Sequence, residues 1–129
     1  MDFIFKARVY YSDTDCGGIV YHARYLDFAE HARSEMLRTA LPKVSQNEMR
    51  HDGMIFVVKS IKKDYKKPAY LDDELTVHTR LMKAEHFSAV FSQEIKRGDD
   101  DICFLEVKVA ALSSDGKRIM MIPKEVIQA

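Results

Sequence analysis

Hydrophobic and polar residues alternate over residues 3–12, which is the period of a β-strand. One side of this predicted strand carries Phe3, Phe5, Ala7, Val9 and Tyr11. The sequence then changes to Ser12-Asp13-Thr14-Asp15, residue types that bond their own backbone and favour turns. The first element is therefore predicted to be a strand that ends in a polar turn.

From about residue 22 the hydrophobic residues recur at the spacing of one face of a helix. This stripe consists of Tyr25, Phe28, Ala29, Ala32 and Met36. Pro42 ends the helix, because the residue before a proline avoids helical angles. We expect a helix of about 18–20 residues with one hydrophobic face, which needs a sheet to cover.

Polar residues 42–53 predict a turn or a short helix, and strand patterns follow one another after it. We expect these strands at residues 54–65, 74–84, 86–95, 102–112 and 119–122. Short polar turns connect them, as in antiparallel pairing. The sequence thus predicts one α+β domain over residues 1–129, with a long helix on the face of an antiparallel sheet.

The composition excludes several classes of function. The chain has 129 residues, of which 47% are hydrophobic and 31% charged, and its 20 basic and 20 acidic residues cancel, so no basic surplus favours nucleic acid. No hydrophobic run approaches the roughly 18 residues of a membrane span, and the N-terminus lacks the layout of a signal peptide. The two cysteines, Cys16 and Cys103, lack the CxxC spacing and are typical of reduced thiols. We therefore expect a cytoplasmic location.

The turn between the first strand and the helix holds the candidates for chemistry. Asp13, Asp15 and His22 surround Gly17 and Gly18, next to a helix start whose backbone N–H groups lack partners. The residue types leave two interpretations open. The turn is a simple connection with capping aspartates, or it is a site where a carboxylate acts as nucleophile or base and helix N–H groups hold an oxyanion.

Residues 13–25, Asp-Thr-Asp-Cys-Gly-Gly-Ile-Val-Tyr-His-Ala-Arg-Tyr, preceded by Arg8-Val9-Tyr10-Tyr11, resemble the signature of the hotdog-fold acyl-CoA thioesterases. More narrowly, they resemble the 4-hydroxybenzoyl-CoA thioesterase type and its YbgC-like branch. The resemblance implies a hotdog fold, with one long helix packed against a curled antiparallel sheet of about five to six strands. It also implies hydrolysis of an acyl-CoA to a free carboxylic acid and CoA.

The resemblance assigns roles to individual residues. Asp15 matches the catalytic aspartate, and the backbone N–H of His22 matches the donor that polarises the thioester carbonyl. Gly18 would keep the turn open to substrate, and Tyr21 and Tyr25 are candidates for substrate binding, although Tyr25 also belongs to the hydrophobic stripe. We interpret Asp13 as a turn and capping residue, and Cys16 as a spectator.

The resemblance also implies partners. We expect a homodimer with active sites at the subunit interface that pairs again into a tetramer, and an association with acyl carrier protein or with the Tol–Pal cell-envelope system. No cofactor is expected, and the scattered histidines have no metal-ligand spacing. CoA carries phosphates, so basic residues are expected near the pocket mouth, and those of residues 62–67 are the densest group. Such a run is also typical of a solvated strand end.

Two other functions stay open from the sequence. One is an acyl-thioester dehydratase or hydratase of the same fold, which would use a histidine rather than the Asp-Thr-Asp turn. The other is a non-catalytic acyl-CoA or acyl-carrier binding or adaptor protein. The sequence leaves the acyl preference undetermined, as well as the choice between Asp15 as nucleophile and Asp15 as general base.

Overall fold

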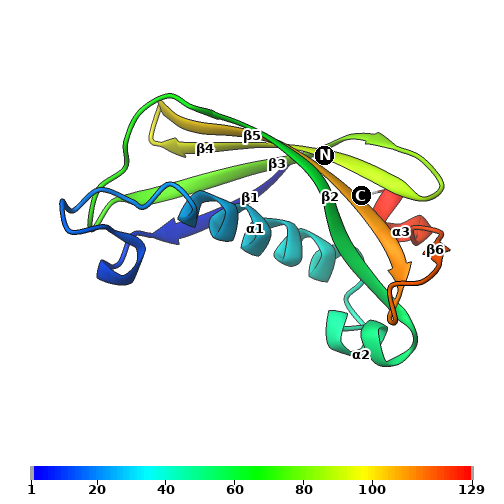
Figure 1. Ribbon diagram of the computed structural model, residues 1–129. Helices are drawn as coiled ribbons and strands as arrows, with labels where there is room; N and C mark the ends of the chain where they lie inside the picture. Colours follow the sequence, from blue (N-terminus) through cyan, green and yellow to red (C-terminus); the bar gives the residue numbers. More distant parts are fainter. Residues whose placement is uncertain (1, 129) are drawn as a thin grey trace.

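One antiparallel sheet and one long helix that lies across it make up most of the molecule (Figure 1). The computed structural model describes residues 2–128. Its strands are β1 (Asp2–Arg8), β2 (Met54–Tyr65), β3 (Glu74–Ala84), β4 (Ser88–Arg97), β5 (Asp100–Ser113) and β6 (Ile119–Met120). Its helices are α1 (Arg24–Ala40), α2 (Gln46–His51) and α3 (Lys124–Ile127), and a 3-10 turn, η1, occupies Tyr11–Asp13. The predicted α+β class is confirmed.

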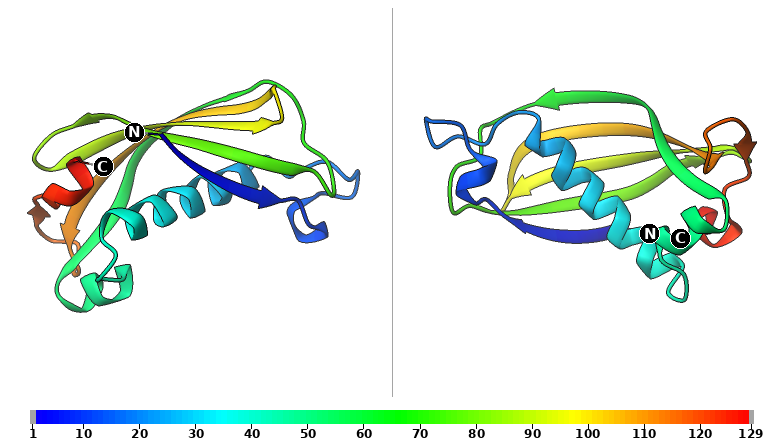
Figure 2. Two further views of the ribbon diagram at one scale, coloured as in Figure 1. Left: turned by 180° about the vertical axis from the view of Figure 1, so that it is seen from behind. Right: turned by 60° about the horizontal axis from the view of Figure 1, so that its bottom comes forward.

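The sheet runs in the order β1-β3-β4-β5-β2, with every neighbouring pair antiparallel and β6 joined to β5. Figure 2 shows β1 and β2 at opposite edges, with α1 crossing the face between them. The pairing register shifts in β2, β3 and β4. Such bulges bend strands and increase their twist, which gives the sheet its curl around α1.

The core lies between α1 and the concave face of the sheet. All five residues of the predicted helical stripe are buried: Tyr25, Phe28, Ala29, Ala32 and Met36. Leu75 and Val77 of β3 are fully buried opposite them, as their alternation predicts. Each large hydrophobic side chain buried in this way contributes about 1.5–3 kcal/mol to stability, so packing on the sheet holds α1 in place.

The first strand ends at Arg8, and our prediction of a strand to residue 12 was wrong. Asp13 Oδ2 accepts the Tyr10 N–H at 2.9 Å and draws the chain into η1. Tyr11, which we assigned to the strand, belongs to η1 and is 80% exposed. In a continued strand the Tyr10 N–H would bond to a neighbouring strand, but here it bonds to the side chain of Asp13. The alternation of side chains does not predict such a local bond.

Smaller differences occur at other boundaries. Helix α1 begins at Arg24 rather than at about residue 22, and the last strand, β6, has only two residues. Helix α3 was not predicted, because four residues are too few to show a helical period. No helix within residues 2–128 is long and apolar enough to cross a membrane.

Candidate active site

Backbone hydrogen bonds fold the connection between β1 and α1 into a closed loop, residues 13–21, which we call the acidic turn. The Asp15 N–H donates to Ile19 O at 2.9 Å, and the Tyr21 N–H donates to Asp13 O at 2.9 Å. Thr14 and Val20 face each other in an isolated β-bridge. The turn is thus a small hairpin. Its hydrogen bonds fix the backbone of Asp15 relative to Tyr21, which leads into α1.

Asp15 lies exposed in this turn with one carboxylate oxygen free. Its Oδ1 accepts the Gly17 N–H at 2.8 Å, while Oδ2 has no partner among residues 2–128. A Cβ at position 17 would lie 3.3 Å from Oδ1, so glycine there allows the carboxylate to fold back. Gly18 has φ +78°, a left-handed conformation that favours glycine. The two glycines therefore present the Asp15 carboxylate to an incoming group.

The segment that leads into α1 supplies a free backbone donor. The N–H groups of Tyr21 and Arg24 are both used, by Asp13 O and Tyr21 O. The His22 N–H has no acceptor within the described part of the chain. Unpaired N–H groups at a helix start combine a hydrogen-bond donor with the positive end of the helix dipole. This arrangement suits a carbonyl oxygen that gains negative charge.

Tyr65, the last residue of β2, holds the same helix start from the sheet. Its hydroxyl donates to the His22 carbonyl oxygen at 3.0 Å. The His22 ring lies beside the rings of Tyr21 and Tyr65, with centroids 4.6 Å and 6.4 Å away. No pattern in the sequence predicts the contact of Tyr65 with the helix start, since His22 lies 43 positions earlier in the chain.

Asp13 has a structural role, as we expected from the sequence. Its Oδ2 caps η1 at Tyr10, and its Oδ1 lies 3.7 Å from Arg24 Nε. Arg24 also donates to Ser12 O at 3.0 Å and pairs with Asp27 at 2.9 Å. Both oxygens of Asp13 are therefore occupied in shaping the turn.

Residues 66–73, which we call the bracing loop, hold the acidic turn from behind. The Val20 N–H donates to Ala69 O at 2.9 Å, and the Leu71 N–H donates to Gly18 O at 3.1 Å. The Tyr25 hydroxyl accepts the Ala69 N–H at 3.2 Å. The bracing loop thereby fixes the backbone of Gly18 and Val20.

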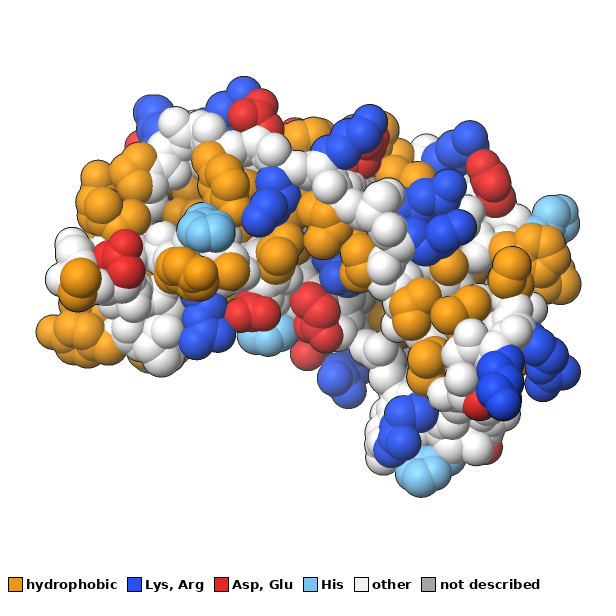
Figure 3. Space-filling model, in the orientation of Figure 1, with side chains coloured by type: hydrophobic (Ala, Val, Ile, Leu, Met, Phe, Trp, Pro, Cys, Tyr) orange, Lys and Arg blue, Asp and Glu red, His pale blue; other side chains and the backbone are white. Residues whose placement is uncertain are grey.

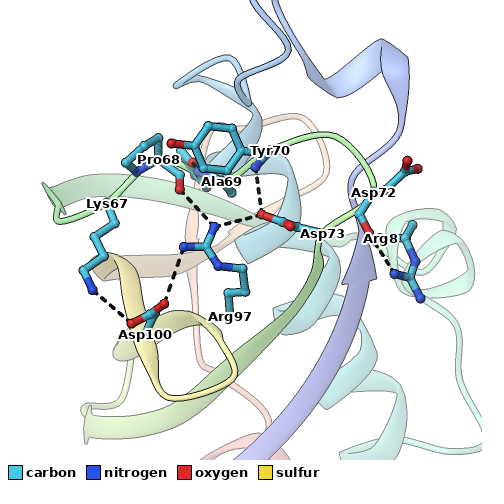
Figure 4. A network of polar contacts seen from close by, with 10 residues as sticks. Arg8, Lys67, Pro68, Ala69, Tyr70, Asp72, Asp73, Arg97 and Asp100 are labelled. Atoms are coloured by element: carbon cyan, nitrogen blue, oxygen red, sulfur yellow. Dashed lines mark hydrogen bonds and ion pairs between the residues drawn. The ribbon is translucent and has the colours of Figure 1, made fainter.

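An ion-pair network in turn fixes the bracing loop (Figure 4). Arg97 of β4 donates to Asp73 Oδ2 at 2.8 Å and to Pro68 O at 3.2 Å. Asp73 Oδ2 also accepts the Tyr70 N–H at 2.9 Å. The hydrogen bond to Asp73 raises the pKa of Arg97 above its ordinary value, so its charge is permanent. Nothing in the sequence pattern pairs Asp73 with Arg97.

A groove of about 130 Å³ runs between the second half of α1 and the first half of β2. Figure 3 shows the molecule hollowed beside the lobe that carries α2, with hydrophobic side chains along the wall. Most of the lining is apolar, including Met36, Leu37, Phe56, Val57, Phe91 and Ile122. The polar residues of its lining are Glu30, Arg33, Ser34 and Gln46. No local pattern in the sequence predicts this groove, because residues of α1, α2, β2, β4, β5 and the C-terminal segment form it together.

Four of the five predicted site residues lie in the acidic turn or directly after it, and all but Gly18 are exposed. Asp15, Gly18, Tyr21 and His22 lie there, with Tyr21 51% exposed at its edge. Tyr25 instead points into the core and is 3% exposed, with its hydroxyl on the bracing loop. The predicted role of Tyr25 in substrate binding remains a prediction. From its buried position Tyr25 would act on the substrate through the bracing loop rather than by direct contact.

The remaining candidate groups lie apart from one another. Cys16 is exposed and Cys103 buried, and both are free thiols. Burial raises the pKa of Cys103 to about 11, which keeps it protonated and unreactive near neutral pH. Within residues 2–128, no group of three or more His, Cys, Asp or Glu side chains is placed to hold a metal ion.

Comparison with known families identifies the fold. The sequence model of the family described as "Thioesterase superfamily" matches residues 17–104. The chain belongs to the thioesterase superfamily. The curled sheet around one helix is the hotdog fold of that superfamily, as predicted. The matched segment includes His22 and begins just after Asp15, so the match does not test the aspartate.

Similar proteins of this superfamily carry YbgC names. Acyl-CoA thioesterase YbgC of Haemophilus influenzae is 42% identical over 124 residues, which cover 96% of this chain and 90% of that protein. Acyl-CoA thioester hydrolase YbgC of Escherichia coli is 36% identical over 126 residues, covering 97% and 92%. A probable thioesterase from Bartonella henselae superposes with a TM-score of 0.87 at 32% identity, covering 95% and 100%. These relatives confirm the resemblance to YbgC thioesterases, whereas the 4-hydroxybenzoyl-CoA type is not confirmed.

Proposed function

We propose that this protein hydrolyses acyl-CoA thioesters at the acidic turn, with Asp15 and the His22 N–H as the catalytic groups. The observation that carries the proposal is that one short segment contains both an exposed carboxylate with a free oxygen, Asp15, and an unpaired N–H just before the helix, that of His22. The names of the YbgC relatives support the substrate class.

In the proposed reaction the thioester carbonyl oxygen accepts the His22 N–H and gains negative charge as the carbonyl carbon is attacked. In one route the Asp15 carboxylate attacks, CoA leaves as a thiolate that takes a proton from water, and water then hydrolyses the mixed anhydride. In the other route Asp15 takes a proton from the attacking water. One oxyanion donor of this kind is worth about 3 kcal/mol in the transition state.

Substitution of Asp15 tests the proposal. Asp15→Asn keeps an oxygen that can accept the Gly17 N–H, so the turn should survive while the charge is lost. We expect kcat/KM to fall at least about a hundredfold on an acyl-CoA panel, measured as thiol release. Asp99→Asn, at an exposed turn, is the matched control and should retain wild-type rates. Wild-type activity in Asp15→Asn would refute the site.

The same assay separates the alternative functions. A dehydratase or hydratase would change the acyl group without releasing a thiol, and a binding or adaptor protein would bind acyl-CoA without turnover. In a single turnover in ¹⁸O-labelled water, label in the Asp15 carboxylate would identify attack by the aspartate. Label only in the product acid would identify the general-base route.

We propose that the active form is a homodimer built on the free edge of β2. Residues 58–65 of this edge strand are all exposed, including Val58, Ile61 and Tyr65. An edge strand with exposed hydrophobic side chains is a template for pairing with another chain. Two-fold antiparallel pairing would bring the Tyr65 end of one β2 to the Val57 end of its copy. The acidic turn of one subunit would then face the groove of the other.

Several narrower expectations remain predictions that rest on the resemblance. They are the 4-hydroxybenzoyl-CoA type, further assembly into a tetramer, the cytoplasmic location, and association with acyl carrier protein or the Tol–Pal system.

A further inference from the structure

Arg33 is a half-buried arginine in the lining of the groove between α1 and β2. Its Nη1 donates to Gln93 Oε1 at 2.9 Å, and it forms no ion pair within residues 2–128. Burial lowers the pKa of Arg33 from its ordinary value, and Glu30, one turn earlier on α1, partly opposes this shift. An arginine remains charged in such a site, so the groove contains a cation that no carboxylate neutralises at contact distance.

A buried hydrogen-bond network fixes the position of this cation. Gln93 of β4 is fully buried, and its Nε2 donates to Ala29 O and to Thr79 Oγ1, both at 2.9 Å. Because both amide protons are used, the Gln93 carbonyl oxygen must point at Arg33. The floor of the sheet therefore holds the guanidinium at one place along α1, although its surroundings are mainly apolar.

The fixed guanidinium lies in the lining of the groove and retains donors that have no partner within residues 2–128. A guanidinium has five N–H groups, and Gln93 accepts from one nitrogen. Met36, Leu37 and Phe56 of the lining are apolar, and the polar lining residues Glu30, Ser34 and Gln46 form no hydrogen bond with Arg33 within residues 2–128. Donors that leave water for an apolar site without an acceptor are costly. A ligand that fills this groove with a plain hydrocarbon would incur that cost, whereas an oxygen atom near Arg33 would remove it.

We propose that the groove binds the acyl group and that Arg33 selects acyl groups carrying an oxygen at their far end over those ending in a methyl group. This inference rests on the proposed thioesterase function and specifies its substrate class. A distal carboxylate would bind the guanidinium through its planar fork. A distal hydroxyl would accept from Arg33 and donate to Glu30, whose carboxylate is exposed at the same groove.

Matched substrates test the selection. One set is hexanoyl-CoA, 6-hydroxyhexanoyl-CoA and adipoyl-CoA, and a longer set is decanoyl-CoA, 10-hydroxydecanoyl-CoA and sebacoyl-CoA. Within each set only the distal end changes. We expect the wild type to favour at least one oxygenated member of a set by about tenfold or more in kcat/KM. The two sets differ in chain length. The set that shows the larger preference therefore indicates how far Arg33 lies from the reacting carbonyl.

Arg33→Met should reduce the ratio of kcat/KM between oxygenated and methyl-ended substrates by about ten- to a hundredfold. Arg33→Lys keeps the charge without the planar fork, and should keep part of that ratio. The matched control is Arg38→Met on the same helix, an arginine that is 63% exposed and pairs with Glu35. It should leave the ratio unchanged. Melting curves establish that each variant is folded.

Two results would overturn the inference. One is a wild-type preference for the methyl-ended member of both sets. The other is an unchanged ratio in Arg33→Met, with all substrates affected alike, which would make Arg33 a structural residue.

A binding measurement separates this inference from the proposed function. Calorimetry on Asp15→Asn with the same thioesters reports affinity without turnover. If the wild type released no thiol from any substrate, the proposed function would fail, and tighter binding of the oxygenated thioesters would still support the role of Arg33. Equal binding of all members would refute that role even in an active thioesterase.

Discussion

At the scale of single residues, two aspartates only two positions apart have different surroundings. Both oxygens of Asp13 are engaged, by the Tyr10 N–H and by Arg24, whereas Asp15 uses one oxygen and leaves the other open. The difference follows from local geometry, because Asp13 ends η1 while Asp15 precedes two glycines. A carboxylate occupied in capping is a poor nucleophile or base, which favours Asp15 over Asp13 for the proposed reaction.

Tyr65→Phe should lower kcat about fivefold with little change in KM. The substitution removes the hydroxyl that donates to the His22 carbonyl oxygen, a hydrogen bond worth about 1 kcal/mol. Its loss would allow the helix start to move relative to Asp15, which affects the transition state more than substrate binding. Steady-state kinetics measure the effect. Tyr70→Phe is the control, since Tyr70 is similarly exposed and its hydroxyl has no hydrogen bond within the described residues.

Cys103 should make stability depend on pH at alkaline values. Its thiol has a pKa of about 11 in the folded protein against an ordinary value of 9.0, because burial penalises the thiolate. The folded pKa is the higher one, so the contribution is complete below pH 9 and is lost as the pH rises toward 11. The loss is about 2–3 kcal/mol at most.

Urea unfolding at several pH values between 8 and 11 measures this loss. In Cys103→Ala the free energy of unfolding should fall less steeply over that range than in the wild type. Identical slopes in the two proteins would show that Cys103 does not ionise differently in the folded and unfolded states.

At the scale of elements, the bracing loop connects the sheet to the acidic turn. Arg97 on β4 holds Asp73 and Pro68, and the loop between them hydrogen-bonds Gly18 and Val20. The acidic turn therefore depends on an ion pair that touches none of its residues.

Arg97→Met should reduce activity more than it reduces stability. The Arg97–Asp73 pair is accessible to solvent, so its loss should cost only about 0.5–1 kcal/mol of unfolding free energy. Loosening of the bracing loop should lower kcat about tenfold, because small displacements of reacting groups are costly. Kinetics and melting curves give the two numbers. A double-mutant cycle with Asp73→Asn should show strong coupling, and additive effects would contradict the proposed link.

At the scale of the whole molecule, the two edges of the sheet predict how copies assemble. Ile61→Lys places a charge on β2 and should convert the dimer to a monomer, with loss of activity, because charged residues block edge pairing. Ile4→Lys makes the same change on β1, at the opposite edge, where the isoleucine is 55% exposed. It should leave the assembly intact. Light scattering on a sizing column measures the mass of each variant, and a monomeric wild type would contradict the proposal.

The sequence by itself determined the elements whose patterns are local. The helical stripe from Tyr25 to Met36 and the alternation of β3 depend on periods of a few residues, and both predict the buried faces correctly. Asp13, Asp15 and His22 are neighbours in the chain, so their shared turn was also visible.

Only the tertiary structure decided which distant residues support that turn and fix Arg33 in the groove. Tyr65 meets His22 across 43 positions, Arg97 meets Asp73 across 24, and Gln93 meets Arg33 across 60. The groove likewise combines residues of α1, β2, β4 and the C-terminal segment. These contacts follow from the strand order and the curl of the sheet around α1. They arise from global packing rather than from any repeat in the chain, so periodicity and spacing could not predict them.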